Sequence, residues 1–360
     1  MLTEFELEKR NSLKLHKPLV YSKICRYEDK VKRGESVALI TLNYDYICNF
    51  SCDHCCSDNL MVRTLEDKKT ANIKKHLTPE DIKEICRQGD ELGLAQIAIS
   101  GGEPLIYPDL DDVVKAINPE KWWIAIDTNG WLLTKEKAKH LKDIGVDKIQ
   151  ISLDNLDSEV HDNFRHKKGA HLQVLRATDY VKDVGLSLLI LTTVTKQRLK
   201  SHEFTTFLDF CKANKFPVYV TLAKPIGNWA GNLDVVCGDE EIKYLKELEK
   251  EYNFTTRFSK SNGIDVGCIA MKRGITITKY GDIFPCPYIQ VSMGNIFEEK
   301  LKDIIDRGLS IKYFSYKNKY TCLSGNKDFE FVQNYMPKIW DSKDTISYDK
   351  VFSKDDYIND

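Results

Sequence analysis

Short apolar runs alternate with amphipathic stretches through the first two thirds of the chain. We expect strands at residues 37–46, 95–100, 122–127, 147–153, 186–194 and 217–222. The pattern between them predicts helices at residues 78–93, 109–117, 134–144, 171–184 and 203–214. Because the strands are too apolar for a sheet with one face in water, the series indicates a parallel sheet covered by helices. The predicted fold class is α/β, and a partial (β/α)6 barrel fits the order of elements.

The same pattern divides the chain into four segments. Residues 1–36 are charged and lack a clear period, so we expect an N-terminal extension with at most a short helix. The alternating series occupies residues 37–235. A charged helix at 239–251, a hairpin signal at Gly281-Asp282 and a helix in EEKLKDIIDRG predict a smaller α+β domain at residues 236–340. Residues 341–360, with six Asp against three Lys, are expected to form an acidic solvated tail.

Composition excludes several classes of protein. Of the 360 residues, 42% are hydrophobic, which is enough for a sizeable core and excludes disorder throughout. The 53 Lys and Arg residues balance 54 Asp and Glu, so no global positive charge points to nucleic acid or anionic lipid. The longest nearly apolar run, Val184 to Val194, is far shorter than the roughly 18 residues that span a bilayer. The start, MLTEFELEKR, does not have the pattern of a secretory signal. We therefore expect a cytoplasmic protein with no nucleic-acid or membrane partner.

The first group of cysteines directly follows the first predicted strand, in CNFSCDHCC. In the cytoplasm, the chain's 11 cysteines point to metal binding or catalysis more than to disulfides. One interpretation is a structural zinc site, which usually takes its ligands as two separated pairs. The other is an iron–sulfur cluster on Cys48, Cys52 and Cys55, whose spacing leaves one iron of a cubane without a protein ligand. The spacing alone leaves both open.

Three further polar motifs follow successive predicted strands. Gly101-Gly102-Glu103-Pro104 comes after the second strand, Asp127-Thr128-Asn129-Gly130 after the third, and Ser152-Leu153-Asp154 ends the fourth. The carboxyl ends of parallel strands form the rim where an α/β barrel places its active site. Each motif alone is compatible with an ordinary turn. Together with the cysteines they predict one site at that rim.

These residues resemble the radical S-adenosylmethionine (SAM) superfamily, whose cluster motif is C-x3-C-x2-C and whose second strand ends in GGEP. The resemblance covers about residues 37 to 225. It implies that Cys48, Cys52 and Cys55 hold a [4Fe–4S] cluster whose unique iron chelates SAM. The contacts it implies for SAM are Gly101, Gly102 and Glu103 for the amino group, and Ser152, Asp154, Arg165 and Asn129 for the carboxylate and ribose. The family commonly has Gly after the Arg, whereas this chain has His166.

The resemblance also implies the chemistry. A reduced cluster gives one electron to SAM, and the resulting 5′-deoxyadenosyl radical abstracts a hydrogen atom from the substrate. A reductant such as flavodoxin or ferredoxin supplies the electron. The substrate is expected to be a peptide or a sugar-like small molecule. The remaining Cys56 and His54 are interpreted as a small packing residue and a loop residue.

A second group of cysteines lies in the C-terminal segment. Cys268, Gly281 and Cys286 have the spacing C-x12-G-x4-C, and Cys322 follows in YTCLSG. This hairpin resembles the auxiliary-cluster extension called SPASM, or its shorter form called twitch. The resemblance implies one auxiliary [4Fe–4S] cluster on these three cysteines, serving oxidation or substrate anchoring. The alternative is scattered buried cysteines in a β-hairpin.

Cys237 lies after the sixth predicted strand, where the chain passes from the barrel to the C-terminal segment. A thiol at the rim could return a hydrogen atom to a substrate radical, which would make the protein a redox-neutral epimerase. The other interpretation is a cysteine that packs the segment boundary. A different class of function, a non-catalytic zinc-binding protein, also remains open at this point.

Overall fold

A computed structural model describes residues 4–33, 35, 37–64, 73–260, 265–340, 342 and 345–358. Its centre is a sheet of eight strands in the order β6-β5-β4-β3-β2-β1-β7-β8. All neighbours are parallel except the antiparallel pair β7 and β8. The strands are β1 (Leu39–Asp45), β2 (Gln96–Gly101), β3 (Trp123–Thr128), β4 (Lys148–Ser152), β5 (Ser187–Val194), β6 (Val218–Leu222), β7 (Gly274–Thr278) and β8 (Ile283–Phe284). The predicted partial barrel is confirmed.

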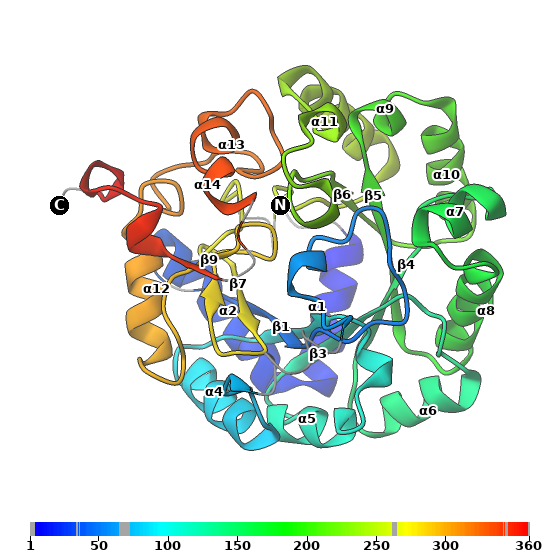
Figure 1. The fold of residues 1–360 in the computed structure, drawn as a ribbon. Helices are drawn as coiled ribbons and strands as arrows, with labels where there is room; N and C mark the ends of the chain where they lie inside the picture. Colours follow the sequence, from blue (N-terminus) through cyan, green and yellow to red (C-terminus); the bar gives the residue numbers. More distant parts are fainter. Residues whose placement is uncertain are drawn as a thin grey trace.

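Helices surround the sheet as an outer ring (Figure 1). They are α4 (Pro79–Glu91), α5 (Leu110–Ile117), α6 (Lys135–Asp143), α7 (Ser158–Arg165), α8 (Ala170–Asp183), α9 (Lys196–Leu199), α10 (His202–Ala213) and α11 (Asp239–Tyr252). The sequence predicts α4, α5, α6, α8, α10 and α11, and misses α7 and α9. Thr78 caps α4 by accepting a bond from Asp81 N, and Asp81 accepts in return from Thr78 N.

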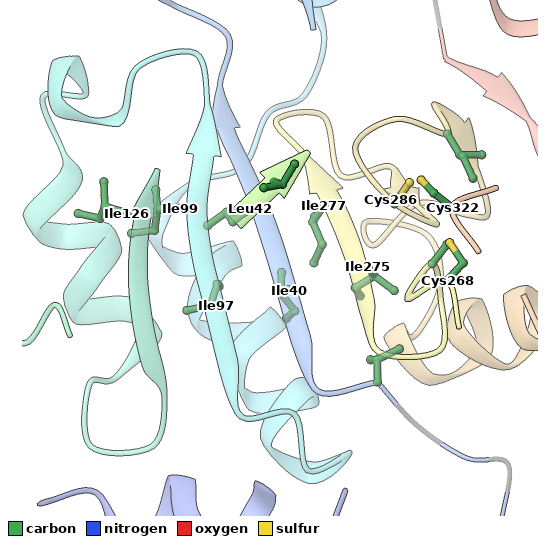
Figure 2. Packing of buried hydrophobic residues seen from close by; sticks show 14 of the residues in the cluster. Ile40, Leu42, Ile97, Ile99, Ile126, Cys268, Ile275, Ile277, Cys286 and Cys322 are labelled. Carbon is green, nitrogen blue, oxygen red and sulfur yellow. The ribbon is translucent and has the colours of Figure 1, made fainter. Parts of the chain in front are cut away.

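The core fills the space between the sheet and the helices. Figure 2 shows Ile40 and Leu42 of β1 beside Ile97 and Ile99 of β2, with Ile275 and Ile277 of β7 on the other side. Ile40, Leu42, Ile97, Ile99 and Ile277 have no exposed surface, and Ile275 is almost fully buried. Burial of such side chains contributes about 1.5–3 kcal/mol each.

The C-terminal segment joins the barrel sheet directly, because β7 pairs in parallel with β1. The predicted hairpin is formed by β7 and β8, with Gly281 at the turn at φ 83°, a conformation that glycine adopts without strain. After the hairpin this segment contains β9 (Val291–Ser292), α12 (Leu301–Leu309), α13 (Glu330–Asn334) and α14 (Pro337–Trp340), and the tail contains β10 (Ile346–Ser347). Short 3-10 turns occupy Asp58–Leu60, Pro104–Ile106, Gly227–Trp229, Leu233–Val235, Tyr348–Lys350 and Lys354–Asp356.

The N-terminal extension differs from the expectation of at most a short helix. It forms α1 (Glu4–His16) and α2 (Pro18–Lys32), and α2 buries Val20, Ile24 and Tyr27 at helical spacing. Lys17, which lies between the two helices, forms an ion pair with Asp147 just before β4. The two helices therefore cover the amino-terminal end of the barrel. A cavity of about 1280 Å³ lies there, at the end opposite the predicted site.

The tail is also not simply solvated. β10 pairs with β9, Val351 and Phe352 are buried, and Asp356 accepts a hydrogen bond from Tyr335. In the sequence these few apolar residues stand among charged ones, so no regular apolar pattern predicts that they are buried. In the described part of the chain, no helix combines the length and apolarity needed to cross a bilayer.

Candidate functional site

The first cysteine group lies on the loop that follows β1. Cys48, Cys52 and Cys55 are free and partly exposed. Phe50 N donates to Cys48 Sγ at 3.5 Å, and Arg165 Nη1 donates to Cys52 Sγ at 3.7 Å. Burial raises the pKa of the Cys48 thiol to about 11. Thiols of this kind remain protonated at neutral pH unless a cation, such as a metal ion, binds the thiolate.

The GGEP loop after β2 runs beside the cysteine loop. Gly102 N donates to Asp45 O at 2.8 Å, and Glu103 N donates to Ile47 O at 2.8 Å. A Cβ on Gly102 would lie 1.9 Å from Ile47 O, so only glycine permits this approach. The two loops are therefore held backbone to backbone.

Glu103 connects this loop to the end of β3. Its buried carboxylate accepts bonds from Thr128 Oγ1 and Asn129 N, both at 2.7 Å, and from Leu105 N at 3.1 Å. Asn129 Nδ2 in turn donates to Asn49 Oδ1, inside the cysteine loop, at 2.8 Å. The structure thus brings the second and third motifs against the first.

The fourth motif is anchored by a buried ion pair. Arg165 Nε donates to Asp154 Oδ2 at 2.7 Å, and Thr193 N donates to Asp154 Oδ1 at 2.9 Å. Burial alone would raise the pKa of the Asp154 carboxyl, but the Arg165 guanidinium outweighs it and holds that pKa well below the usual range. Since Arg165 also contacts Cys52, the pair links the end of β4 to the cysteine loop.

Helix α7 explains the position of Arg165, which is its last residue. His166 follows with φ 50°, in the left-handed region that favours glycine. His166 therefore stands at a position whose backbone conformation glycine adopts without strain. Ser152 ends β4.

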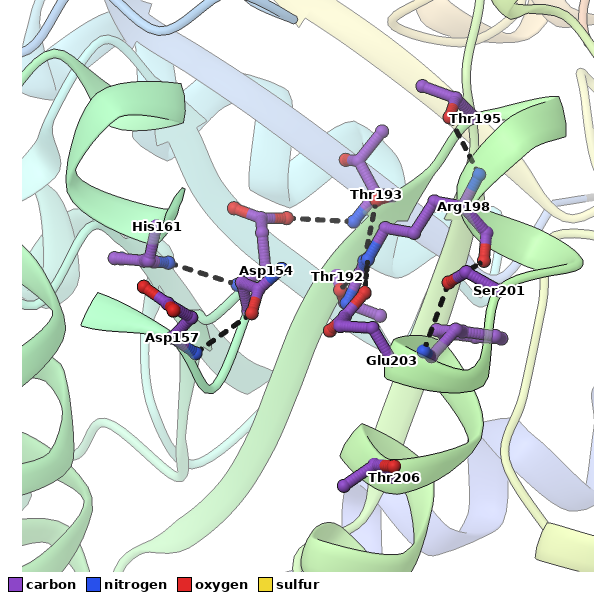
Figure 3. A network of polar contacts seen from close by, with 12 residues as sticks. Asp154, Asp157, His161, Thr192, Thr193, Thr195, Arg198, Ser201, Glu203 and Thr206 are labelled. Atoms are coloured by element: carbon purple, nitrogen blue, oxygen red, sulfur yellow. Dashed lines mark hydrogen bonds and ion pairs between the residues drawn. The ribbon is translucent and has the colours of Figure 1, made fainter. Parts of the chain in front are cut away.

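A polar network continues from Asp154 across β5 (Figure 3). Arg198 Nη1 donates to Thr192 Oγ1 at 2.7 Å and to Thr193 O at 2.8 Å, while its Nε donates to Glu203. The network fixes the carboxyl end of β5, where Thr193 N binds Asp154.

The second cysteine group also converges. Cys268, Cys286 and Cys322 are buried, and Figure 2 shows their sulfurs facing one another from three separate segments. Cys322 acts electrostatically to raise the pKa of the Cys268 and Cys286 thiols, and Cys268 acts in the same direction on Cys286. Lys272 lies in the same region: burial lowers the pKa of its ammonium to about 8, and Cys268 acts in the opposite direction.

The donor sets fit iron–sulfur clusters. Among the described residues, no three Cys, His, Asp or Glu side chains are arranged to hold one metal ion. In a cubane each thiolate binds a different iron, so its sulfurs need not meet at one point. The chain offers two groups of three soft donors, which agree with such sites.

The sequence model of the radical SAM superfamily matches residues 42–210, and that of the SPASM iron–sulfur cluster-binding domain matches residues 268–326.

The chain belongs to the radical SAM superfamily. It is an enzyme of that superfamily with a SAM-binding [4Fe–4S] cluster and an auxiliary cluster in its SPASM-type domain.

Curated relatives and solved structures agree with this assignment. The AdoMet-dependent heme synthase of Methanosarcina barkeri (strain Fusaro) is 26% identical over 286 residues, which cover 71% of this chain and 78% of the relative. The GTP 3′,8-cyclase of Staphylococcus aureus (strain Mu3) is 27% identical over 258 residues, covering 67% and 73%. Streptococcus suis SuiB bound to its precursor peptide SuiA shares the fold, with a TM-score of 0.61 at 19% identity, covering 92% of this chain and 80% of that one.

Two other residues of this radical SAM enzyme's cysteine loop have packing contacts. His54 stacks on Phe164 with ring centroids 4.6 Å apart, and burial lowers the pKa of its imidazole to about 3. Cys56 is partly buried, with Sγ 3.8 Å from Ser57 Oγ. The contact of Cys56 agrees with the expected small packing residue, whereas His54, expected only as a loop residue, is buried against Phe164.

Cys237 has no exposed surface and belongs to the hydrophobic core. Its carbonyl accepts a bond from Lys327 N at 2.9 Å, so it lies where the barrel meets the SPASM segment. Burial raises the pKa of its thiol to about 12.

Sequence reasoning missed Tyr107, which locks the GGEP loop. Its hydroxyl donates to Asp45 O at 2.8 Å and accepts from Gly102 N at 3.2 Å. The only signal was its place three residues after Pro104 in GGEPLIY.

Proposed function

We propose that Cys48, Cys52 and Cys55 hold the SAM-binding cluster, and that Cys268, Cys286 and Cys322 hold the auxiliary cluster. The observation that carries the first assignment is the contact between Arg165 and Cys52, because it joins a SAM-binding motif to a cluster thiol. When bound, the first cluster and SAM supply the 5′-deoxyadenosyl radical that abstracts a hydrogen atom from the substrate.

The chain's own residues orient SAM. Gly101 and Gly102 bring their backbone into close contact with the chain that leads into the cysteine loop, and Glu103 supplies a carboxylate beside it for the amino group. Ser152, Asp154, Arg165 and Asn129 provide the remaining polar groups for the carboxylate and ribose. Asp154 keeps Arg165 charged and aligned, so the guanidinium stabilises negative charge on Cys52.

The substrate in this proposal is a peptide or a sugar-like small molecule. The auxiliary cluster accepts an electron from the substrate radical or anchors the substrate. A flavodoxin- or ferredoxin-like partner reduces the first cluster. The domain boundaries at residues 37–235 and 236–340 belong to the same proposal, with β7 as the strand that joins the two segments.

The iron content of two variants tests the ligand assignment. Replacing Cys48, Cys52 and Cys55 together with Ala should leave roughly half of the wild-type iron, because each site supplies its own thiolates. The reciprocal variant at Cys268, Cys286 and Cys322 should also leave roughly half. Cys25→Ala, which changes a cysteine outside both groups, should leave iron content unchanged. Loss of all iron from either folded triple variant would refute two independent sites.

A second candidate activity is epimerisation with Cys237 as hydrogen donor. Lys224 and Cys322 both act electrostatically on the pKa of its thiol, which supports a position near the auxiliary cluster. Cys237→Ser should then still cleave SAM but lose the inverted product and accumulate substrate-derived shunt species. Normal product in normal yield would instead favour oxidation through the auxiliary cluster, which requires no protein hydrogen donor.

A further inference from the structure

Two cations lie over one aromatic ring beside β6, an edge strand of the sheet. The Lys224 ammonium, just after β6, lies 5.0 Å from the centroid of the Tyr288 ring. The Arg257 guanidinium carbon lies 5.1 Å from the same centroid. Arg257 follows Thr255, whose backbone pairs with β6, so both cations come from the edge of the sheet. Cations over a ring face are attracted to its negative quadrupole, which orders both side chains.

This group lies between the two sets of cysteines. Cys286 and Cys322 of the second set act electrostatically on Arg257. Lys224 and Arg257 both act on Cys56, the neighbour of the first set. Tyr288 lies two residues after Cys286, and Asn228, four residues after Lys224, donates its N–H to Cys55 O at 3.0 Å, so a molecule held by the two cations would lie between the two proposed clusters.

Neither cation has an acidic partner among the described residues. Lys224 is 4% exposed, and its ammonium donates to Leu222 O. Arg257 Nε is buried with no hydrogen-bond partner. The carboxylate of Asp127 interacts with Arg257 only electrostatically, since it is bonded to the Gln150 amide. Burying unpaired charge costs free energy, so an anion from outside the chain would stabilise this arrangement.

The position of the ammonium is built into the chain. A Cβ on Gly325 would lie 2.7 Å from Lys224 Nζ and 2.9 Å from its Cε. Gly325 follows Cys322 by three residues, so the segment carrying an auxiliary cysteine also leaves space for the lysine. A side chain at position 325 would therefore displace the Lys224 ammonium, whereas glycine leaves room for it.

We propose that Lys224 and Arg257 bind an oxyanion of the substrate, a carboxylate or a phosphate, and so anchor the substrate between the two clusters. A guanidinium offers paired donors to such a group and an ammonium offers a compact charge. The inference rests on the proposed function, because it takes the cysteine groups as the two cluster sites. It narrows the substrate to molecules that carry a negative group near the reacting carbon.

Binding of small anions to the anaerobic holoenzyme with SAM tests the proposal. The probe is trifluoroacetate, followed by its ¹⁹F line width and displaced by inorganic phosphate or acetate at constant ionic strength. Wild-type enzyme should show saturable broadening. Lys224→Gln combined with Arg257→Gln should weaken binding about ten- to a hundred-fold. Stronger displacement by acetate identifies a carboxylate site, and stronger displacement by phosphate a phosphate site.

Two further variants control for charge and folding. Lys243→Gln with Arg176→Gln changes two exposed cations and the net charge by the same amount, and should leave trifluoroacetate affinity unchanged. Gly325→Ala keeps both cations but displaces the ammonium, and should weaken binding about tenfold.

Three results would overturn the proposal. They are an absence of saturable binding in the wild type, an equal affinity in the double variant, and an Arg257→Gln variant in which only the auxiliary-cluster EPR signal changes. The last result would mean that Arg257 serves the cluster thiolates. SAM cleavage without substrate is measured in the same samples: cleavage without anion binding refutes only the anchor, whereas anion binding without cleavage refutes the proposed function.

Discussion

The Glu103 carboxylate lies beside the cysteine loop and connects the GGEP loop to the end of β3. Burial raises the pKa of its carboxyl above the usual value, although the bonds that Thr128 Oγ1, Asn129 N and Leu105 N donate to it act in the opposite direction. The resemblance had assigned it to the SAM amino group. The structure adds that the same carboxylate positions Asn129, another residue assigned to SAM.

Glu103→Gln should therefore weaken SAM binding about ten- to a hundred-fold, because a charge-assisted bond contributes roughly 1.5–3 kcal/mol. An anaerobic binding titration measures the change, and iron content should remain that of the wild type. Thr128→Val is the matched control, because it removes one donor and keeps the carboxylate. If SAM affinity is unchanged in Glu103→Gln, the residue does not bind the amino group. If Thr128→Val loses as much affinity, Glu103 acts through the loop alone.

The residues that sequence reasoning found belong to motifs whose spacing is local. Cys48, Cys52 and Cys55 lie within one turn-rich loop, and the GGEP motif is contiguous. Lys224 and Arg257 carry no such signal, because a single cation in a sequence does not reveal whether an acidic side chain will lie beside it. Only the packed structure shows that neither has an acidic partner among the residues it describes.

At the scale of elements, α7 is the helix that prediction missed at the site. Asp157 caps its N-terminus with a carboxylate that accepts from Glu159 N and Val160 N, and His161 of this helix is buried. With eight residues it is too short for a clear helical period. The helices α1 and α2 were missed for a related reason, since α2 buries few apolar residues among many charged ones.

His161 predicts a pH dependence of stability. Burial lowers the pKa of its imidazole from 6.5 to about 4, and its Nδ1 accepts a bond from Asp154 N at 3.2 Å. Between these two pKa values the unfolded chain binds a proton that the folded chain does not. The free energy of unfolding should therefore fall as pH falls through this window, by about 1.4 kcal/mol per pH unit.

Urea unfolding of wild type and His161→Asn, from about pH 7.5 to about pH 5.5, measures this contribution. The loss of stability on acidification should be smaller in His161→Asn, whereas His140→Asn, which changes an exposed histidine of α6, should follow the wild type. Curves of equal slope for wild type and His161→Asn would show that His161 does not resist protonation.

At the scale of the whole molecule, the alternation of strands and helices predicted the parallel barrel. It did not predict that β7 would pair with β1, which is more than 200 residues away in sequence. No local pattern specifies a contact at that separation, because pairing depends on which sheet edge is free after the barrel has formed. This pairing places the SPASM segment beside the strand that leads into the first cysteine loop.

The central claim is that Cys48, Cys52 and Cys55 form the site at which SAM is cleaved. The most direct test is the amount of 5′-deoxyadenosine formed with dithionite under anaerobic conditions, in the wild type, in the triple Ala variant and in Cys56→Ala. The account predicts 5′-deoxyadenosine from the wild type and from Cys56→Ala, since Cys56 is not assigned to the cluster, and none from the triple variant. Formation of 5′-deoxyadenosine by a folded triple variant at the wild-type rate would contradict it.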